Sequence, residues 1–152
     1  VRIAPAEDSD SARCGANAKR KQVPKMPTED DLVAAARQAR LFAHAPYSGF
    51  KVGAALICDD GKIITGCNVE NATYGLTICA ERVAVYNAIS QGETAITAVL
   101  VLTDTRPAAA PCGACRQVLY EHAPDLEILM GNPQGEFKRT TIRDLLPEAF
   151  SR

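Results

Sequence analysis

Two short segments carry residues that could together build a metal centre for catalysis. Cys79-Ala80-Glu81 offers one thiol and one carboxyl group, and Pro111-Cys112-Gly113-Ala114-Cys115 offers two further thiols. Three protein ligands leave a tetrahedral zinc ion with an open position for water, which marks a catalytic site rather than a structural one. We therefore predict a zinc site made of Cys79, Cys112 and Cys115, with Glu81 close to it.

The order of these residues is informative beyond their number. Cys-x-Glu followed by Pro-Cys-x-x-Cys matches the known signature of zinc deaminases, in which the Glu is the general acid and base. A lone Cys-x-x-Cys could instead be a redox pair or half of a structural site, and Cys67 could close the site as a fourth ligand. His44 and His122 are the only histidines, so any zinc site here must be built on thiolates.

Both motifs should stand at the start of a helix. Residues 112–121 are predicted to form a helix on which Cys112 and Cys115, three positions apart, face the same way. Pro111 suits a helix start, because its missing N–H would have no partner there. A second helix is expected over residues 79–90. The two helix N-termini would then meet at the metal and lower the pKa of its thiol ligands.

Three thiolates around Zn²⁺ leave a net negative charge, which weakens the ability of the metal to acidify water. Arg82 and Arg116 each directly follow one of the motifs, so we predict that they supply compensating positive charge beside the ligands. The alternative for Arg82 is a solvated charge on the helix surface.

The rest of the sequence predicts alternating helices and strands. A helix capped by Thr28, with acidic residues in its first turn, should run to about His44. Strands are expected over residues 51–58, 62–68, 96–102, 126–130 and 136–140, and a short helix over 141–146. The almost unbroken apolar run at 96–102 is typical of a strand covered on both faces. This alternation predicts an α/β domain with one sheet between two layers of helices.

Composition favours one folded domain with a polar leader. Of the 152 residues, 47% are hydrophobic and 23% are charged, which predicts a single domain over residues 28–152. Residues 1–27 are polar and lack an apolar period, so we predict a disordered leader or a tail added for expression. A basic targeting patch at Lys19-Arg20-Lys21 is the alternative.

Net charge and hydropathy limit the classes of partner that the protein is expected to bind. The net charge is −1, and six of the 17 basic residues stand in the leader, so the domain itself is mildly acidic. Proteins that bind nucleic acid usually carry a basic excess, so we expect no nucleic-acid partner. No apolar run is long enough for a signal peptide or a membrane span, so we expect a cytoplasmic protein without a membrane partner.

Five segments of the chain resemble the cytidine deaminase family, in its small homotetrameric and zinc-dependent form. The resemblance covers about residues 28–151, nearly all of the predicted domain. It rests on APYSGFKVGAA at 45–55, GCNVENA at 66–72, CAER at 79–82, PCGACRQ at 111–117 and LLPEAF at 145–150.

This resemblance implies a three-layer α/β/α sandwich with one mixed five-stranded sheet. It also implies one Zn²⁺ per subunit, held by Cys79, Cys112 and Cys115, with water as the fourth ligand. The activated water would attack C4 of the pyrimidine, while Glu81 moves protons to N3 and to the departing ammonia. The reaction would turn cytidine and 2′-deoxycytidine into uridine and 2′-deoxyuridine in pyrimidine salvage.

The resemblance also implies which residues hold the nucleoside. Asn68 and Glu70 would bond the ribose 3′-hydroxyl, and residues two apart in a strand point to the same face. Phe50 would pack against the base, and the backbone of Ala80 would contact it. On the residues alone, Asn68 and Glu70 are better explained as ordinary polar groups at a strand end, and Phe50 could belong to the core.

A homotetramer is implied as well, with pockets completed by neighbouring subunits. The family borrows a C-terminal aromatic residue from a neighbour to close the pocket, which makes Phe150 a predicted contact. Tyr74 is a second predicted contact. For both side chains, packing within their own subunit is the alternative.

Three other functions share parts of these motifs. A deaminase of a cytosine-containing antibiotic such as blasticidin S has the same metal motif, but Asn68-Val69-Glu70-Asn71 favours a ribose and so a nucleoside. A polynucleotide-editing deaminase needs a basic channel, which the acidic domain disfavours. A structural zinc module would need Cys67 as its fourth ligand.

Overall fold

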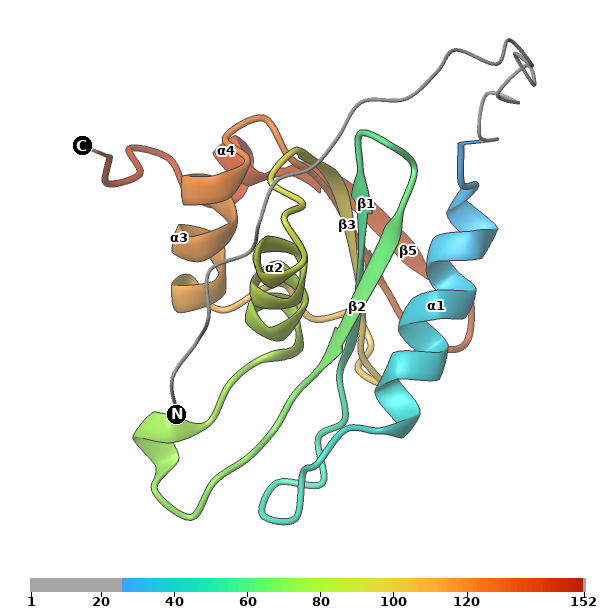
Figure 1. Ribbon diagram of the computed structural model, residues 1–152. Helices are drawn as coiled ribbons and strands as arrows, with labels where there is room; N and C mark the ends of the chain where they lie inside the picture. The colour runs from blue at the N-terminus through green and yellow to red at the C-terminus, as the bar shows by residue number, and fades with distance from the viewer. Residues whose placement is uncertain (1–25, 152) are drawn as a thin grey trace, which may run out of the picture.

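A five-stranded mixed sheet forms the middle layer of the protein (Figure 1). The computed structural model describes residues 26–151. The predicted leader at 1–27 therefore lies, apart from its last two residues, outside the described residues. The elements in chain order are α1 (Glu29–Leu41), β1 (Gly53–Cys58), β2 (Ile63–Cys67), the 3-10 turn η1 (Tyr74–Leu76), α2 (Ala80–Ser90), β3 (Ile96–Leu102), α3 (Gly113–His122), β4 (Glu127–Gly131), β5 (Phe137–Thr141) and α4 (Ile142–Leu145).

The strands lie in the order β2-β1-β3-β4-β5. β3 and β4 are parallel, and every other neighbouring pair is antiparallel. In Figure 1, α1 covers one face of the sheet, and α2, α3 and α4 lie on the other. The predicted α/β/α sandwich with one mixed five-stranded sheet is therefore confirmed. None of the helices in the described part of the chain is long and apolar enough to span a membrane.

The central strands are buried on both faces, and their alternate residues belong to two separate hydrophobic cores. On β1, Ala54 and Leu56 pack into the core beneath α2 and α3, whereas Ala55 and Ile57 pack into the core beneath α1. All six residues of β1 are buried. Successive side chains of a strand point to opposite faces of the sheet. A strand that helices cover on both faces therefore needs apolar residues at every position.

The first helix begins where predicted but ends earlier. Thr28 caps it in a reciprocal capping box with Asp31, which satisfies two otherwise unpaired donors at the helix start. Its end, however, is Leu41, so the predicted end at His44 is wrong. The backbone of His44 instead pairs with the stretch after β2: its N–H donates to Asn68 O at 3.0 Å, and its carbonyl accepts from Glu70 N at 2.8 Å.

The two helices that carry the cysteine motifs start almost as predicted. Cys79 and Cys112 are the N-cap residues of α2 and α3, both with extended backbones. Pro111 precedes the cap residue Cys112, directly before the first turn of α3. Its carbonyl accepts a hydrogen bond from Arg116 Nε at 2.7 Å. The predicted strands are all present, with ends shifted by at most two residues.

Candidate active site

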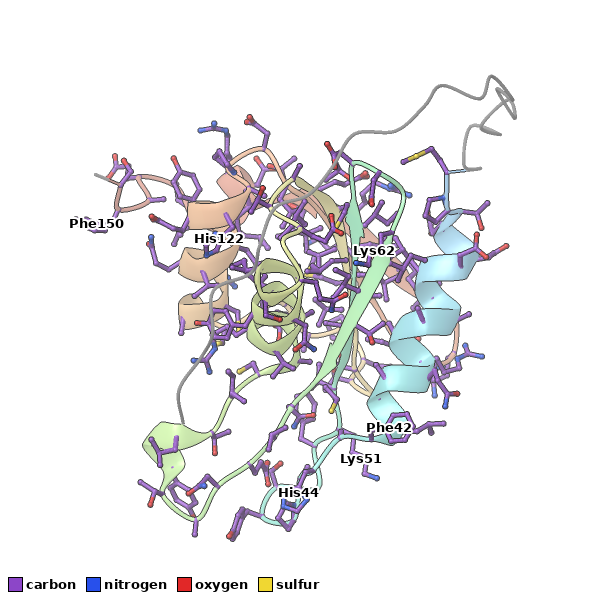
Figure 2. The ribbon with its side chains drawn as sticks, in the orientation of Figure 1. Phe42, His44, Lys51, Lys62, His122 and Phe150 are labelled. Atoms are coloured by element: carbon purple, nitrogen blue, oxygen red, sulfur yellow. The ribbon has the colours of Figure 1, made fainter. Side chains whose placement is uncertain are left out.

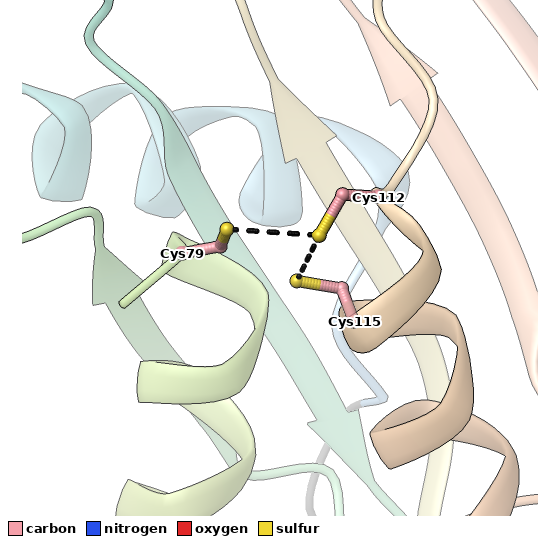
Figure 3. A group of neighbouring side chains, drawn as sticks. All are labelled: Cys79, Cys112 and Cys115. Carbon is pink, nitrogen blue, oxygen red and sulfur yellow. Dashed lines mark hydrogen bonds between the residues drawn. The ribbon is translucent and has the colours of Figure 1, made fainter. Parts of the chain in front are cut away.

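Three cysteine sulfurs meet between the N-termini of α2 and α3 (Figure 3). Cys79 Sγ lies 3.8 Å from Cys112 Sγ, and Cys112 Sγ lies 3.5 Å from Cys115 Sγ. Zinc–thiolate bonds of about 2.3 Å in tetrahedral geometry place two sulfurs about 3.8 Å apart. The three thiols therefore fit a zinc ion in both chemistry and spacing.

The local backbone directs these sulfurs toward one another. As N-cap residues, Cys79 and Cys112 are extended, and neither side chain makes a capping hydrogen bond. Cys115 follows in the first turn of α3, where three-residue spacing places it on the same face as Cys112. Cys115 is fully buried, while Cys112 is exposed. The site thus has one deep ligand and one that borders on open space.

Electrostatics favours a thiolate at Cys79. A hydrogen bond from the Cys115 thiol, aided by the nearby Arg82 guanidinium, lowers the pKa of Cys79 to about 5. The same hydrogen bond, together with burial, raises the pKa of Cys115. A cation held by all three sulfurs displaces the shared proton, so metal binding at this cluster is linked to proton release.

The two predicted charge-compensating arginines have different surroundings. Arg82 Nη2 lies 3.7 Å from Cys79 Sγ and 3.3 Å from Thr77 O, and its buried Nε has no partner among the described residues. Arg116 instead donates to two carbonyls, those of Pro111 at 2.7 Å and Leu145 at 2.8 Å. Arg82 is therefore placed to offset thiolate charge, whereas Arg116 holds the backbone before Cys112 against the C-terminal segment.

Cys67 does not join the sulfur cluster. Within residues 26–151, Cys79, Cys112 and Cys115 form a group whose ligand atoms all lie within 4.8 Å of one another, without Cys67 or a histidine. Cys67 ends β2 and lines a separate groove with Phe42. The fourth position predicted for water is thus not taken by Cys67.

A second group of possible metal ligands is already paired with a lysine side chain. Cys58, Asp60 and Glu93 also bring three ligand atoms within 4.8 Å of one another. The ammonium group of Lys62, however, donates to Glu93 Oε1 at 3.0 Å. This pairing neutralises one carboxylate of the group, so the thiol cluster at α2 and α3 is the better metal site.

Glu81 lies beside the cluster at the wall of a cavity of about 220 Å³. It is on the first turn of α2 and is 4% exposed. Burial raises the pKa of its carboxyl group, because a charged carboxylate is disfavoured away from water. Cys79 and Cys112 line the same cavity. A buried acid and a metal site therefore face one small space, as acid–base chemistry on a single ring requires.

The predicted sugar and base residues line this cavity as well. Asn68 is buried; its Oδ1 accepts from Val52 N and its Nδ2 donates to Phe50 O, both at 2.8 Å. Phe50, Asn68 and Glu70 all line the cavity, so Asn68 and Glu70 point to one side although β2 ends before them. An amide oxygen and an amino group can each make a further bond, so the two bonds to the backbone of Phe50 and Val52 leave Asn68 able to bind a ligand.

The remaining predicted contacts lie elsewhere in the single chain. Tyr74 is 77% exposed and packs edge-on against Tyr47 beside a second cavity, which shares Glu70 and Thr77 with the first. Phe150 is 69% exposed and stands at the outer end of the C-terminal segment, beyond α3 (Figure 2). Ala80 is fully buried at the start of α2. The chain thus brings neither Tyr74 nor Phe150 into its own small cavity.

Sequence reasoning missed Thr103 as a cavity residue. It follows β3 and is 2% exposed, and its Oγ1 accepts from Ala109 N at 3.1 Å. It lines the cavity together with Ala109 and Ala110. A polar residue directly after an almost wholly apolar strand was the available signal, because ligand sites gather at strand ends.

Comparison with known proteins points to one family. A family model for the cytidine and deoxycytidylate deaminase zinc-binding region matches residues 26–130. The curated cytidine deaminase of Halalkalibacterium halodurans is 50% identical over 121 residues, which are 79% of this chain and 92% of the relative. That of Sporosarcina psychrophila is 44% identical over 124 residues, or 81% and 91% of the two chains.

Solved structures give the same result. The crystal structure of cytidine deaminase from Burkholderia pseudomallei is 50% identical, with a TM-score of 0.79 over 82% of this chain and all of that one. The cytidine deaminase from Mycobacterium tuberculosis is 43% identical, with a TM-score of 0.71 over 81% of this chain and 97% of that one.

Proposed function

Since the chain belongs to the zinc-binding cytidine and deoxycytidylate deaminase family and is a hydrolase that deaminates cytidine, we propose that it converts both cytidine and 2′-deoxycytidine, in cytoplasmic pyrimidine salvage. One observation carries this proposal. The thiol cluster, the buried acid Glu81 and the polar residues Asn68 and Glu70 all border one cavity. That combination suits a small polar molecule with a ring at one end and hydroxyl groups at the other.

Cys79, Cys112 and Cys115 would hold one zinc ion per chain. When bound, the metal would supply the Lewis acidity that makes water nucleophilic near neutral pH. Arg82 beside Cys79 would offset part of the thiolate charge, which otherwise opposes this effect.

Glu81 would carry the protons of the reaction. It would take one proton from the attacking water and deliver it to N3 of the pyrimidine. It would then take the second proton of that water, by now on the C4 hydroxyl, and pass it to the amino group, so that the C4–N bond breaks, the C4 carbonyl forms and ammonia leaves. A group that both accepts and donates protons works best when its pKa lies near the working pH. Burial shifts the pKa of Glu81 in that direction.

The nucleoside would extend over both cavities, with its base in the first and its sugar where the two meet. Phe50 would pack against the base ring, and the backbone of Ala80 would contact the base. Asn68 and Glu70 would bond the ribose 3′-hydroxyl. Glu70 lines both cavities, so a sugar at their junction would meet its carboxylate while the base reaches Glu81.

A homotetramer would complete each pocket. Tyr74 and Phe150 are aromatic and exposed, and neither lines the small cavity of its own chain. Exposed apolar side chains that gather in a patch mark surfaces that associate, and Tyr74 packs against the exposed Tyr47. Contacts of Tyr74 and Phe150 with the pocket of a neighbouring subunit would bury them and shield the base from water.

Metal analysis combined with a deamination assay tests this function. The purified protein should contain about one zinc ion per chain and release ammonia from cytidine and 2′-deoxycytidine, with no turnover of blasticidin S or of cytosine in single-stranded DNA. Glu81→Gln, which keeps the shape of the side chain, should retain zinc and lose turnover. Full zinc occupancy without turnover of either nucleoside would refute the proposal.

A further inference from the structure

The loop between α1 and β1 is hydrogen-bonded to Asn68 and Glu70, the two residues that would bind the sugar. Backbone hydrogen bonds join His44 to both Asn68 and Glu70, as described above. Gly49 then takes a φ of +69°, a conformation that glycine adopts without steric cost. This turn brings the N–H of Phe50 back to the side chain of Ser48.

The Ser48 hydroxyl joins two groups of the candidate active site. It accepts a hydrogen bond from Phe50 N at 2.9 Å, and it also hydrogen-bonds to Glu70 Oε1. A hydroxyl has one proton to give. Because an amide N–H can only donate, the hydroxyl proton must go to the carboxylate. The direction of both hydrogen bonds is therefore fixed.

Three donors from the described residues hold the Glu70 carboxylate. Its Oε2 accepts from Tyr47 N at 2.8 Å and from Ser48 N at 3.2 Å, and its Oε1 accepts from the Ser48 hydroxyl. These bonds, the hydroxyl first among them, lower the pKa of Glu70. The carboxylate stays ionised, and its remaining lone pairs can only accept. A ligand group that meets it in the cavity must then be a donor, such as a sugar hydroxyl.

We propose that Ser48 is a positioning residue that orients the Glu70 carboxylate toward the 3′-hydroxyl of the nucleoside. The inference rests on the proposed function, in which Glu70 binds the sugar. Ser48 itself lines the second cavity beside Glu70 but not the cavity that Glu81 faces. Its contribution is to substrate affinity through the sugar, and it has no part in the chemistry at C4.

The test compares Ser48→Ala on two substrates that differ in one hydroxyl group. For cytidine, the loss of one hydrogen bond to a charged group should raise KM about tenfold and leave kcat within about twofold. For 3′-deoxycytidine, which lacks the donor to Glu70, KM should change by less than about twofold. Ser48→Thr keeps the hydroxyl and should restore the behaviour of the unmodified protein on cytidine.

Controls separate this role from a structural one. Ser90→Ala changes an exposed serine whose hydroxyl donates to Asn87 O at the end of α2, and it should leave both substrates unaffected. If Ser48→Ala proves unstable, Ser48→Cys should show the same difference between the two substrates. An equal loss on both substrates, or a fall in kcat alone, would overturn the proposal. Absence of cytidine turnover in the unmodified protein would instead refute the proposed function.

Discussion

Gly66→Ala should move the start of α2 and displace the residues that it carries into the site. A Cβ atom at Gly66 would lie 2.4 Å from Ala84 N and 2.5 Å from Ala80 O. Both are backbone atoms of α2, so no side-chain rotation can relieve the clash. Restoring ordinary contact requires the helix to retreat from β2 by about 1 Å. Cys79 and Glu81 stand on that end of the helix.

The expected losses of thermal stability and of activity follow from this displacement. Forcing one extra methyl group into a packed interior costs about 1–3 kcal/mol, which lowers the Tm of a domain of this size by about 3–10 °C. Activity should fall further, because a misplacement of about 1 Å at a reacting group costs about 100-fold in rate. We therefore expect kcat/KM per zinc-loaded chain to fall by about two orders of magnitude.

Two other glycine variants make the comparison specific. At Gly53 a Cβ atom would lie 2.1 Å from Ala36 O of α1, so Gly53→Ala should destabilise the opposite layer by a similar amount. At Gly75 nothing lies within 4 Å of the added atom, so Gly75→Ala should have little effect on the Tm. Calorimetry, zinc content and cytidine kinetics of the three variants provide the measurement. Gly66→Ala with unchanged kcat/KM, or with no larger a loss than Gly53→Ala, would show that packing of α2 on β2 does not set the catalytic geometry.

Three further predictions concern the metal and the subunit contacts. Cys115→Ala should bind far less than one zinc ion per chain, whereas Cys67→Ala should keep full occupancy in metal analysis; zinc loss from Cys67→Ala would contradict an open fourth position. Arg82→Gln should release zinc at a higher pH than the unmodified protein during acid titration with a chromogenic chelator, because loss of the guanidinium raises the pKa of the neighbouring thiol and protons then compete earlier; identical release curves would argue against this. Phe150→Ala should lose about 3–10-fold in kcat/KM, and co-refolding it with inactive Glu81→Gln should restore activity if the aromatic ring comes from a neighbour; mixtures no more active than Phe150→Ala alone would refute a shared pocket.

Local signals were enough to predict most of the framework. The run at 96–102 is covered on both faces and forms β3 as predicted. The Thr28 cap and the cysteine motifs likewise mark the starts of α1, α2 and α3. These features depend on residues close together in the sequence, whose spacing reveals helix period, strand period or capping chemistry.

Features that depend on distant partners were not predictable. The end of α1 was placed too late because the residues before Pro46 carry no stop signal of their own; the pairing of His44 with Asn68 and Glu70 draws them out of the helix. Ser48 went unnoticed for the same reason, since its importance comes from a carboxylate 22 positions away. A single hydroxyl in a turn has no periodicity that could reveal its partner.

The negative charge of the three thiolates is offset by positive charge beside Cys79. Three thiolates around a divalent cation leave one negative charge, which opposes the acidification of water. Arg116 directs its described hydrogen bonds to the carbonyls of Pro111 and Leu145 rather than to a thiolate. Arg82, with one nitrogen near Cys79 and another buried without a described partner, remains as the nearby cation, aided by the N-termini of α2 and α3. Loss of Arg82 should therefore affect the metal itself, whereas loss of Arg116 should loosen the backbone that presents Cys112.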